Sequence, residues 1–401
     1  MTSTDSTIDD RIEVVLGRWL AEHSDALIAL RRDLHANPEL SGEEHRTTET
    51  VRRLVAAAGY TVRPMSIGTG LFAEQPGTTA RLAFRADLDA LAMHDLKDVS
   101  YRSRVDGVCH ACGHDVHTTI GVGVAQFFAD HPELISTSVR FIFQPAEERV
   151  PGGALEVVRD GGLDGIDAVV GVHCEPKLPS GAIGLRAGSI TSAADMVTIE
   201  LRGPGGHTAR PELTVDTIAL AAELVQRVPS IVDDATADDQ VKLVFGAIHG
   251  GDAANVIPTS VELRASVRTP SLDTWEILES AVRAAVAEVI SGTGAEVTID
   301  YVRGVPPTVN DPRVIEAMRD AGERVLGLGG VTEAHQSWGG DDFAWLTREV
   351  PGAYLRLGVH EEGGPLLDLH AGRFDVDEHS IEIGIRLIAT TLATLASGLP
   401  A

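Results

Sequence analysis

The chain has 401 residues, of which 43% are hydrophobic and 23% charged, proportions typical of a globular protein. Because a single core seldom grows to this length, two domains are expected. A formal net charge of −26 argues against nucleic acid or an anionic membrane as the main partner, since both require basic surface.

The expected location is the cytoplasm. The stretch from Met1 to Arg11 is polar and acidic and does not resemble a secretion signal. No apolar run reaches the ~18 residues of a membrane-spanning helix. Without a secretion signal, the three cysteines indicate a reducing compartment, with the thiols kept for reactivity or for metal binding.

The first third of the chain alternates helix and strand patterns. Helices are predicted at residues 12–34, 50–58 and 117–130, and strands at residues 81–85, 139–143 and 168–172. This alternation is typical of an α/β fold with a mostly parallel central sheet and helices on both faces.

The pattern changes near residue 194. A strand, a helix, two strands, a helix and a strand follow at residues 196–201, 215–228, 241–248, 261–267, 275–290 and 297–302. This is the ferredoxin-like α+β order, which folds as an independent unit. The sequence therefore predicts a catalytic domain in two parts, residues 1–193 and 305–401, interrupted by an inserted domain at residues 194–304.

Polar side chains follow the predicted strands of the first domain. They are Asp87 and Asp89, Glu147 and Glu148, His173, and His370 after a strand at residues 353–357, with Cys112 and His114 in a loop before a helix. Sites in open α/β sheets form outside the carboxyl ends of the strands. A thiol, imidazoles and carboxylates at one edge are the ligands of a metal site.

Simpler interpretations exist for parts of this set. Cys109 and Cys112 have the spacing of a redox pair, but His110 and His114 beside them favour a metal-binding loop. A structural zinc site would need a second cysteine pair, which the sequence lacks.

Glu147 and Glu148 are a more specific signal than the aspartates. Pro145 ends the preceding strand, so both carboxylates can face one pocket, one as a metal ligand and one as a general base. Two solvated glutamates on a surface loop are the alternative. A buried strand that leads directly into them makes it the weaker one.

The chain also resembles a known family. The motifs that carry the resemblance are RRDLHANPELS at residues 31–41, RADLDAL at 85–91, HACGHDVH at 110–117, FQPAEE at 143–148, GGH at 205–207, NVIP at 255–258 and DDF at 341–343. In this order they are similar to the co-catalytic metallopeptidase-type amidohydrolases, which include hippurate hydrolases, N-acyl-amino-acid deacylases and indole-acetyl-amino-acid hydrolases. The resemblance covers nearly the whole chain.

The resemblance implies two divalent metal ions, with manganese or zinc expected. The implied ligands are Cys112, His114, Glu148, His173 and His370. It also implies Glu147 as the general base, and Asp87, Asp89 and Asp115 as outer groups that orient ligands. The Cys112 thiolate is expected between the two ions.

In the inserted domain the resemblance implies three substrate-binding residues. His207 would stabilise the oxyanion, and Asn255 and Arg268 would hold a substrate carboxylate. Taken alone, His207 would be an exposed loop histidine and Asn255 a turn residue. The insertion is further expected to act as a lid and to join a homodimer or a higher homo-oligomer.

Two departures from the family pattern concern loops. Residues 92–95 read AMHD where relatives carry Pro and later Glu, and residues 339–343 read GGDDF in place of Gly-Ser-Glu-Asp-Phe. Neither removes an implied ligand, so they bear on the substrate. The predicted function is hydrolysis of the amide bond of an N-acyl amino acid. A dipeptidase or carboxypeptidase on the same scaffold, and a non-catalytic metal-containing binding protein, are the alternatives.

Overall fold

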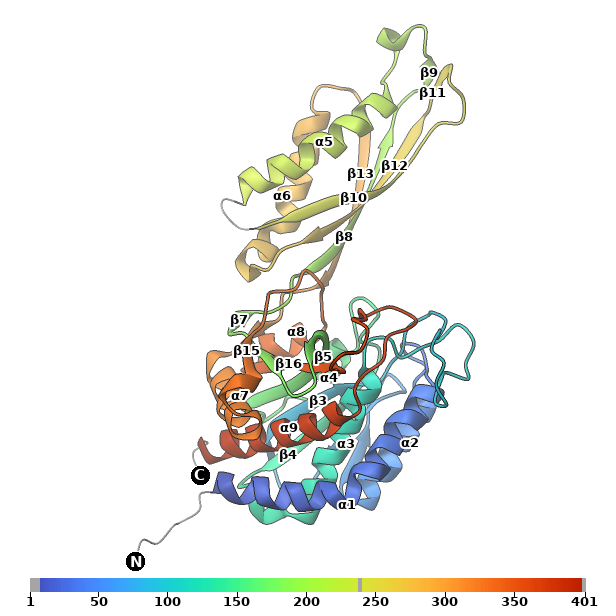
Figure 1. Ribbon diagram of the computed structural model, residues 1–401. Coiled ribbons are helices and arrows are strands. Elements are labelled where there is room, and N and C mark those ends of the chain that lie inside the picture. Colours follow the sequence, from blue (N-terminus) through green and yellow to red (C-terminus); the bar gives the residue numbers. More distant parts are fainter. Residues whose placement is uncertain (1–7, 237–239, 399–401) are drawn as a thin grey trace, which may run out of the picture. The chain divides into compact units, whose positions relative to one another are not determined.

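An eight-stranded sheet forms the centre of the larger of two compact units (Figure 1). The computed structural model describes residues 8–236 and 240–398. Within them the larger unit takes the residues up to Gly188, then Val309–His335 and the residues from Asp342 onward. The smaller unit takes Ser189–Thr308 and Gln336–Asp341. The sequence predicted the corresponding divisions after residues 193 and 304.

The strand order of the large sheet is β1-β2-β4-β3-β5-β16-β6-β15. The strands are β1 (Thr61–Pro64), β2 (Leu71–Glu74), β3 (Ala80–Asp87), β4 (Ser138–Gln144), β5 (Ala168–Pro179), β6 (Ile183–Leu185), β15 (Val331–Glu333) and β16 (Gly352–His360). The central strands β4, β3, β5 and β16 pair in parallel, whereas β1 and β2 are antiparallel. The carboxyl ends of the central strands therefore meet at one edge.

Helices cover both faces of this sheet. They are α1 (Ile8–Ala36), α2 (His45–Ala57), α3 (His114–Asp130), α4 (Ala154–Arg159), α7 (Pro312–Leu326), α8 (Phe343–Glu349) and α9 (His379–Gly398). Neighbouring residues of β3 point to opposite faces: Phe84 lies against Gly121 of α3, and Arg85 lies over the ring of Phe343 in α8. Figure 1 shows α1, α3 and α9 side by side.

The smaller unit is a four-stranded antiparallel sheet with two helices. Its elements are β8 (Ala194–Arg202), α5 (Thr217–Ala235), β10 (Lys242–His249), β12 (Ser260–Arg268), α6 (Leu272–Ile290) and β13 (Glu296–Val305). The spatial order β10-β12-β8-β13 is that of the ferredoxin-like fold. A separate short pair joins β9 (Gly206–His207) to β11 (Val256–Ile257). The predicted fold class is confirmed.

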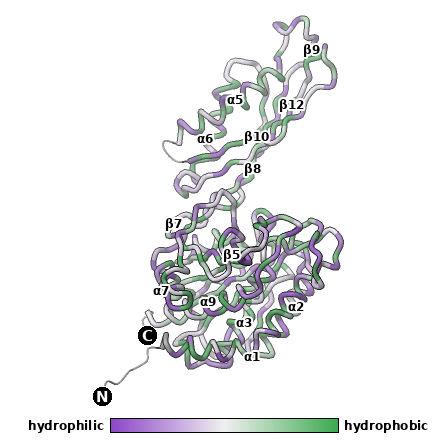
Figure 2. Tube along the Cα trace, in the orientation of Figure 1, coloured by the Kyte–Doolittle hydropathy of each residue, from purple (hydrophilic) through white to green (hydrophobic). Residues whose placement is uncertain are grey.

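Each unit has its own hydrophobic core. The core of the larger unit includes Phe84, Val170 and Ile388, and that of the smaller unit includes Val197, Leu224 and Leu263. In Figure 2 hydrophobic colour recurs along α9. By length and composition α9 could cross a membrane, but 67% of its apolar window is buried in the fold, as expected of a core helix.

Several element boundaries differ from the sequence prediction, and three of the differences have a clear structural origin or lie at the site. β5 continues past His173 to Pro179 because its parallel pairing with β16 continues through Glu175. His114 is the first residue of α3 rather than part of the loop before it. The helix α5 runs through Pro229 to Ala235.

Candidate metal centre

Gly113 allows the thiol and the first imidazole of the site to lie close together. It adopts φ 91°, and a Cβ there would lie 2.6 Å from the Cys174 sulfur, so only glycine fits. Its carbonyl oxygen accepts bonds from the amides of Val116 and His117 at the start of α3. Cys112 and His114 therefore flank a turn whose shape the backbone fixes.

His114 offers one ring nitrogen to the site. Its Nδ1 lies 2.9 Å from the carbonyl oxygen of Asp89 and so carries the proton of that hydrogen bond. Its Nε2 lies 3.8 Å from Glu147 Oε2 and 3.9 Å from Glu148 Oε1. Glu148 Oε1 also faces His370 Nε2 at 3.3 Å, but among the described residues neither His114 Nε2 nor Glu148 Oε1, both buried, makes a hydrogen bond. Buried polar atoms normally have one, so this pair suits a cation.

His173 approaches the thiol from the strand β5. Its Nδ1 lies 2.8 Å from the carbonyl oxygen of Cys174, and its Nε2 lies 3.7 Å from the Cys112 sulfur. His117, next to it, uses both ring nitrogens within the protein: Nδ1 bonds Asp87 at 2.7 Å, and Nε2 accepts from the Cys174 amide at 2.9 Å. His117 therefore supports the strand that carries His173 and offers no free nitrogen.

His370 enters the site from the segment after β16. Its backbone adopts φ 57°, and its amide donates to the carbonyl oxygen of Ala111 at 2.8 Å. This bond ties a residue from the end of the chain to the loop that carries Cys112. His370 Nε2 lies 3.3 Å from Glu148 Oε1. At 54% its side chain is the most exposed of the five implied ligands, which marks the open side of the site.

The charges of the site favour a cation. Burial, reinforced by Glu148, raises the pKa of the Cys112 thiol despite the opposing charge of His114. Burial acts to lower the pKa of His114, but Asp87 and Cys112 outweigh it and raise that pKa well above its usual range. The surroundings of His114 therefore favour a positive charge at this position, which a metal ion would supply. The donor set fits a divalent metal.

The three predicted outer aspartates lie in different places. The carboxylate of Asp87 bonds His117 and Arg85, the latter at 2.5 Å. Asp89 orients His114 through its backbone carbonyl, and its side chain accepts from the Glu148 amide at 3.0 Å. Asp115 faces away from the cluster, toward Arg31 and His35 on α1.

Several supporting residues were missed in the sequence. Arg85 and Gln144 both donate to Asp342, which also accepts from the Ala154 amide at the end of the Glu147 loop. Glu44 accepts from the Ala146 amide at 2.8 Å. No spacing rule links these positions, although Arg85, Gln144 and Asp342 lie within the quoted motifs.

In the smaller unit the structure brings together two of the three predicted substrate-binding residues. His207 pairs with Val256, directly after Asn255, and both predicted residues are exposed. The third residue, Arg268, lies at the far end of the nine-residue strand β12, which begins shortly after Asn255. It is therefore roughly 25 Å from the start of that strand. Its guanidinium donates to the carbonyl oxygen of Trp338 at 2.7 Å.

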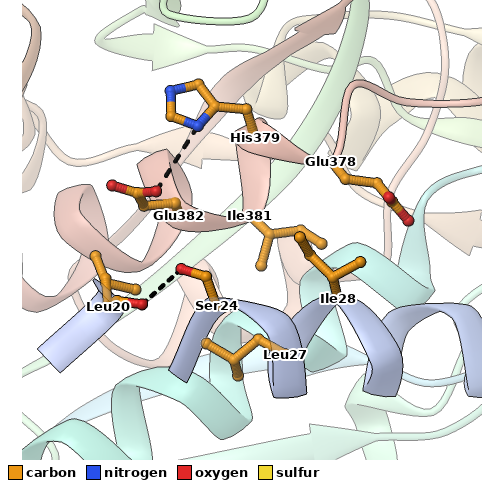
Figure 3. Close-up of a pocket in the computed structure, with 8 residues that line it drawn as sticks. All are labelled: Leu20, Ser24, Leu27, Ile28, Glu378, His379, Ile381 and Glu382. Atoms are coloured by element: carbon orange, nitrogen blue, oxygen red, sulfur yellow. Dashed lines mark hydrogen bonds and ion pairs between the residues drawn. The ribbon is translucent and has the colours of Figure 1, made fainter. Parts of the chain in front are cut away.

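A small cavity lies elsewhere in the larger unit, between α1 and the start of α9 (Figure 3). Apolar side chains lie beside Glu378, Glu382 and His379, and His379 pairs with Glu382 at 3.7 Å. None of its lining residues belongs to the metal cluster, so it is separate from the candidate site.

The fold and the site define a metal-dependent amidohydrolase. The sequence model of Peptidase family M20/M25/M40 matches residues 83–394. The chain belongs to this family, as its motifs predicted.

Individual relatives include proteins named as a deacetylase and a peptidase, and one named as a ligase. A putative glutamate–cysteine ligase of Rhodococcus jostii (strain RHA1) is 44% identical over 93% of this chain, which spans only 47% of that protein. An N-acetyl-L-cysteine deacetylase of Bacillus subtilis (strain 168) is 33% identical over 88% of this chain and 84% of its own. Among solved structures, a dinuclear metal-binding peptidase of family M20 from Bacillus subtilis has a TM-score of 0.81 and 30% identity, covering 94% of this chain and 99% of its own.

Proposed function

We propose that the chain hydrolyses the amide bond between an acyl group and the nitrogen of an amino acid, with Cys112, His114, Glu148, His173 and His370 holding two divalent ions. The observation that carries this proposal is the cluster of Cys112, His114 and Glu148, whose possible ligand atoms all lie within 4.8 Å of one another in the interior of the larger unit. Non-catalytic metal binding would not require a second carboxylate, yet Glu147 lies 3.8 Å from His114.

The donor types admit zinc or manganese. A thiolate with imidazoles suits zinc, and carboxylates at a partly exposed position also suit manganese. When bound, such ions polarise the scissile carbonyl and make water acidic enough to attack near neutral pH. Cys112 lies near His173 and also near His114 and Glu148, so its thiol would contribute to holding the ions.

Glu147 is the general base of the proposed reaction. Its carboxylate takes the proton of the attacking water and returns it to the amine that leaves. The side chain is only 11% exposed, so most of it is shielded from bulk solvent. His207, Asn255 and Arg268 are proposed to bind substrate, and the insertion at residues 194–304 is proposed to serve as a lid and a dimer contact.

The names of the relatives indicate which substrates to test first. A relative with 33% identity is named for N-acetyl-L-cysteine, so acylated cysteine is the first amino acid to examine. The experiment is a panel of N-acetyl, benzoyl and indole-acetyl amino acids, with dipeptides, each assayed with zinc and with manganese. Hydrolysis of acyl amino acids that a chelator abolishes supports the proposal, whereas exclusive cleavage of dipeptides favours the peptidase alternative.

The Glu147→Gln variant tests the base. Because glutamine cannot accept the proton of water, we expect at least a ~100-fold loss of kcat, with the metal content kept in elemental analysis. Full activity of this variant would contradict the assignment of Glu147.

A further inference from the structure

The backbone next to Glu147 adopts an unfavourable conformation, which the surrounding contacts must stabilise. Ala146, the residue before it, is completely buried and adopts φ 57°. L-residues disfavour this left-handed region, so it persists only where the surroundings impose it. The amides on the two sides of Glu147, those of Ala146 and Glu148, both donate to carboxylates from distant parts of the chain.

One of these carboxylates belongs to Asp89, and the other to Glu44. Glu44 has no exposed surface, and its Oε1 accepts from Ala146 at 2.8 Å and from Gly42 at 2.7 Å. Asp89 accepts from Glu148 at 3.0 Å and from the Ser41 hydroxyl at 2.6 Å. We call the loop that carries Glu147 the catalytic loop. The segment that precedes α2 supplies Glu44, one of the two carboxylates that bind this loop, and through Ser41 it contacts the other, Asp89.

We infer that Glu44 is a positioning residue for the general base: it holds the Ala146 amide so that the left-handed turn presents Glu147 beside His114. The inference rests on the proposed role of Glu147. Glu44 itself is neither one of the proposed metal ligands nor one of the proposed substrate-binding residues, and its hydrogen bonds go to the amides of Ala146 and Gly42. Its effect on the reaction passes through the backbone of one residue, Ala146.

Glu39 provides a matched control on the same segment. Its carboxylate also accepts two backbone amides, those of Arg46 at 2.9 Å and Thr47 at 2.8 Å. These amides belong to the first turn of α2 instead of the catalytic loop. Replacing Glu39 or Glu44 by alanine removes the same number of backbone hydrogen bonds, so both changes should lower stability.

The test compares Glu44→Ala, Glu44→Gln and Glu39→Ala in the metal-loaded protein. We expect Glu44→Ala to lower kcat by roughly 10- to 100-fold, because small misplacements of a catalytic group have effects of this size. KM and metal content should stay near their original values. Glu44→Gln keeps an oxygen acceptor for Ala146 and should recover most of kcat, and Glu39→Ala should keep kcat. An equal fall of kcat in both alanine variants overturns the inference.

A double variant separates this inference from the proposed function. If Glu44 acts only through Glu147, adding Glu44→Ala to Glu147→Gln lowers the residual activity no further. An additive loss overturns the role of Glu44 and leaves Glu147 as the base. Full activity of Glu147→Gln alone overturns the proposed base itself.

Discussion

At the scale of single residues, His35 is a buried histidine on α1 that pairs with Asp115, the residue directly after the proposed ligand His114. The ring has no exposed surface and lies between two carboxylates, with Nδ1 2.7 Å from Asp115 and Nε2 3.3 Å from Asp95. Burial acts to lower the pKa of His35, but Asp115 and Asp95 outweigh it and raise the pKa to about 10. The imidazole is therefore charged in the folded protein at neutral pH.

This charge predicts a pH dependence of stability. The folded pKa lies above the unfolded value of about 6.5, so the contribution of His35 is complete below that pH and is lost as the pH rises toward 10. The difference in unfolding free energy between the original protein and His35→Gln should be largest below about pH 6.5 and shrink by roughly 3 kcal/mol by pH 9. Urea unfolding of the metal-loaded proteins at each pH measures it. A difference that stays constant with pH would show that His35 is neutral.

Single residues also show what the sequence could predict about the site. Cys112, His114, Glu147 and Glu148 belong to short motifs that follow predicted strands or precede a helix, and chemistry alone suggested them. Glu44 could not be found in this way, because its partner is the backbone amide of Ala146, 102 positions away. A backbone amide has no sequence signature, so such contacts appear only in the folded structure.

At the scale of elements, the loop after β4 folds back tightly on the end of its own strand. The Gly153 amide donates to the Ala146 carbonyl oxygen at 3.0 Å. A Cβ on Gly153 would lie 1.9 Å from the Pro145 carbonyl oxygen, a backbone atom that cannot rotate away. The loop that carries Glu147 and Glu148 therefore depends on the absence of a side chain at residue 153.

Gly153→Ala should displace this loop. We expect a loss of stability of about 2 kcal/mol or more and a fall in both kcat and bound metal, because Glu148 moves with the loop. Gly17→Ala is the control: residue 17 lies in α1, and its Cβ would meet no atom within 4 Å. It should raise stability by about 0.5 to 1 kcal/mol. Thermal melting and elemental analysis of both variants measure the contrast, and unchanged metal content in Gly153→Ala would contradict the expected displacement.

The elements themselves were largely predictable, and their ends were not. Apolar runs and helical periodicity located β3, β4 and the order of elements in the smaller unit. The extension of β5 beyond His173 depends on pairing with β16, which lies about 180 residues later in the chain. The start of α3 at His114 follows from the left-handed Gly113, and α5 continues through Pro229 because its apolar face stays packed to Val232.

At the scale of the whole molecule, the two units are expected to respond differently to metal removal, because only the larger unit carries the proposed ligands. The proposed ligands come from four segments of the larger unit: the start of α3, the loop after β4, the strand β5 and the segment after β16. A ligand that binds only the folded state stabilises it by RT ln(1 + L/Kd), where L is the free ligand concentration. None of the proposed ligands lies in the smaller unit, which has its own core.

A chelator should therefore destabilise the larger unit selectively. Without the ions, His114, Glu148 and the thiol remain buried together with no compensating metal charge, so local opening around β5 and α3 becomes more frequent. Hydrogen exchange followed by mass spectrometry should show faster exchange in α3, β5 and the segment around His370, and unchanged exchange in β8, β12 and α6. Restoring zinc or manganese should reverse the effect. Equal acceleration in β12 and β5 would instead mean that the two cores unfold as one cooperative unit, and that metal binding stabilises the entire chain.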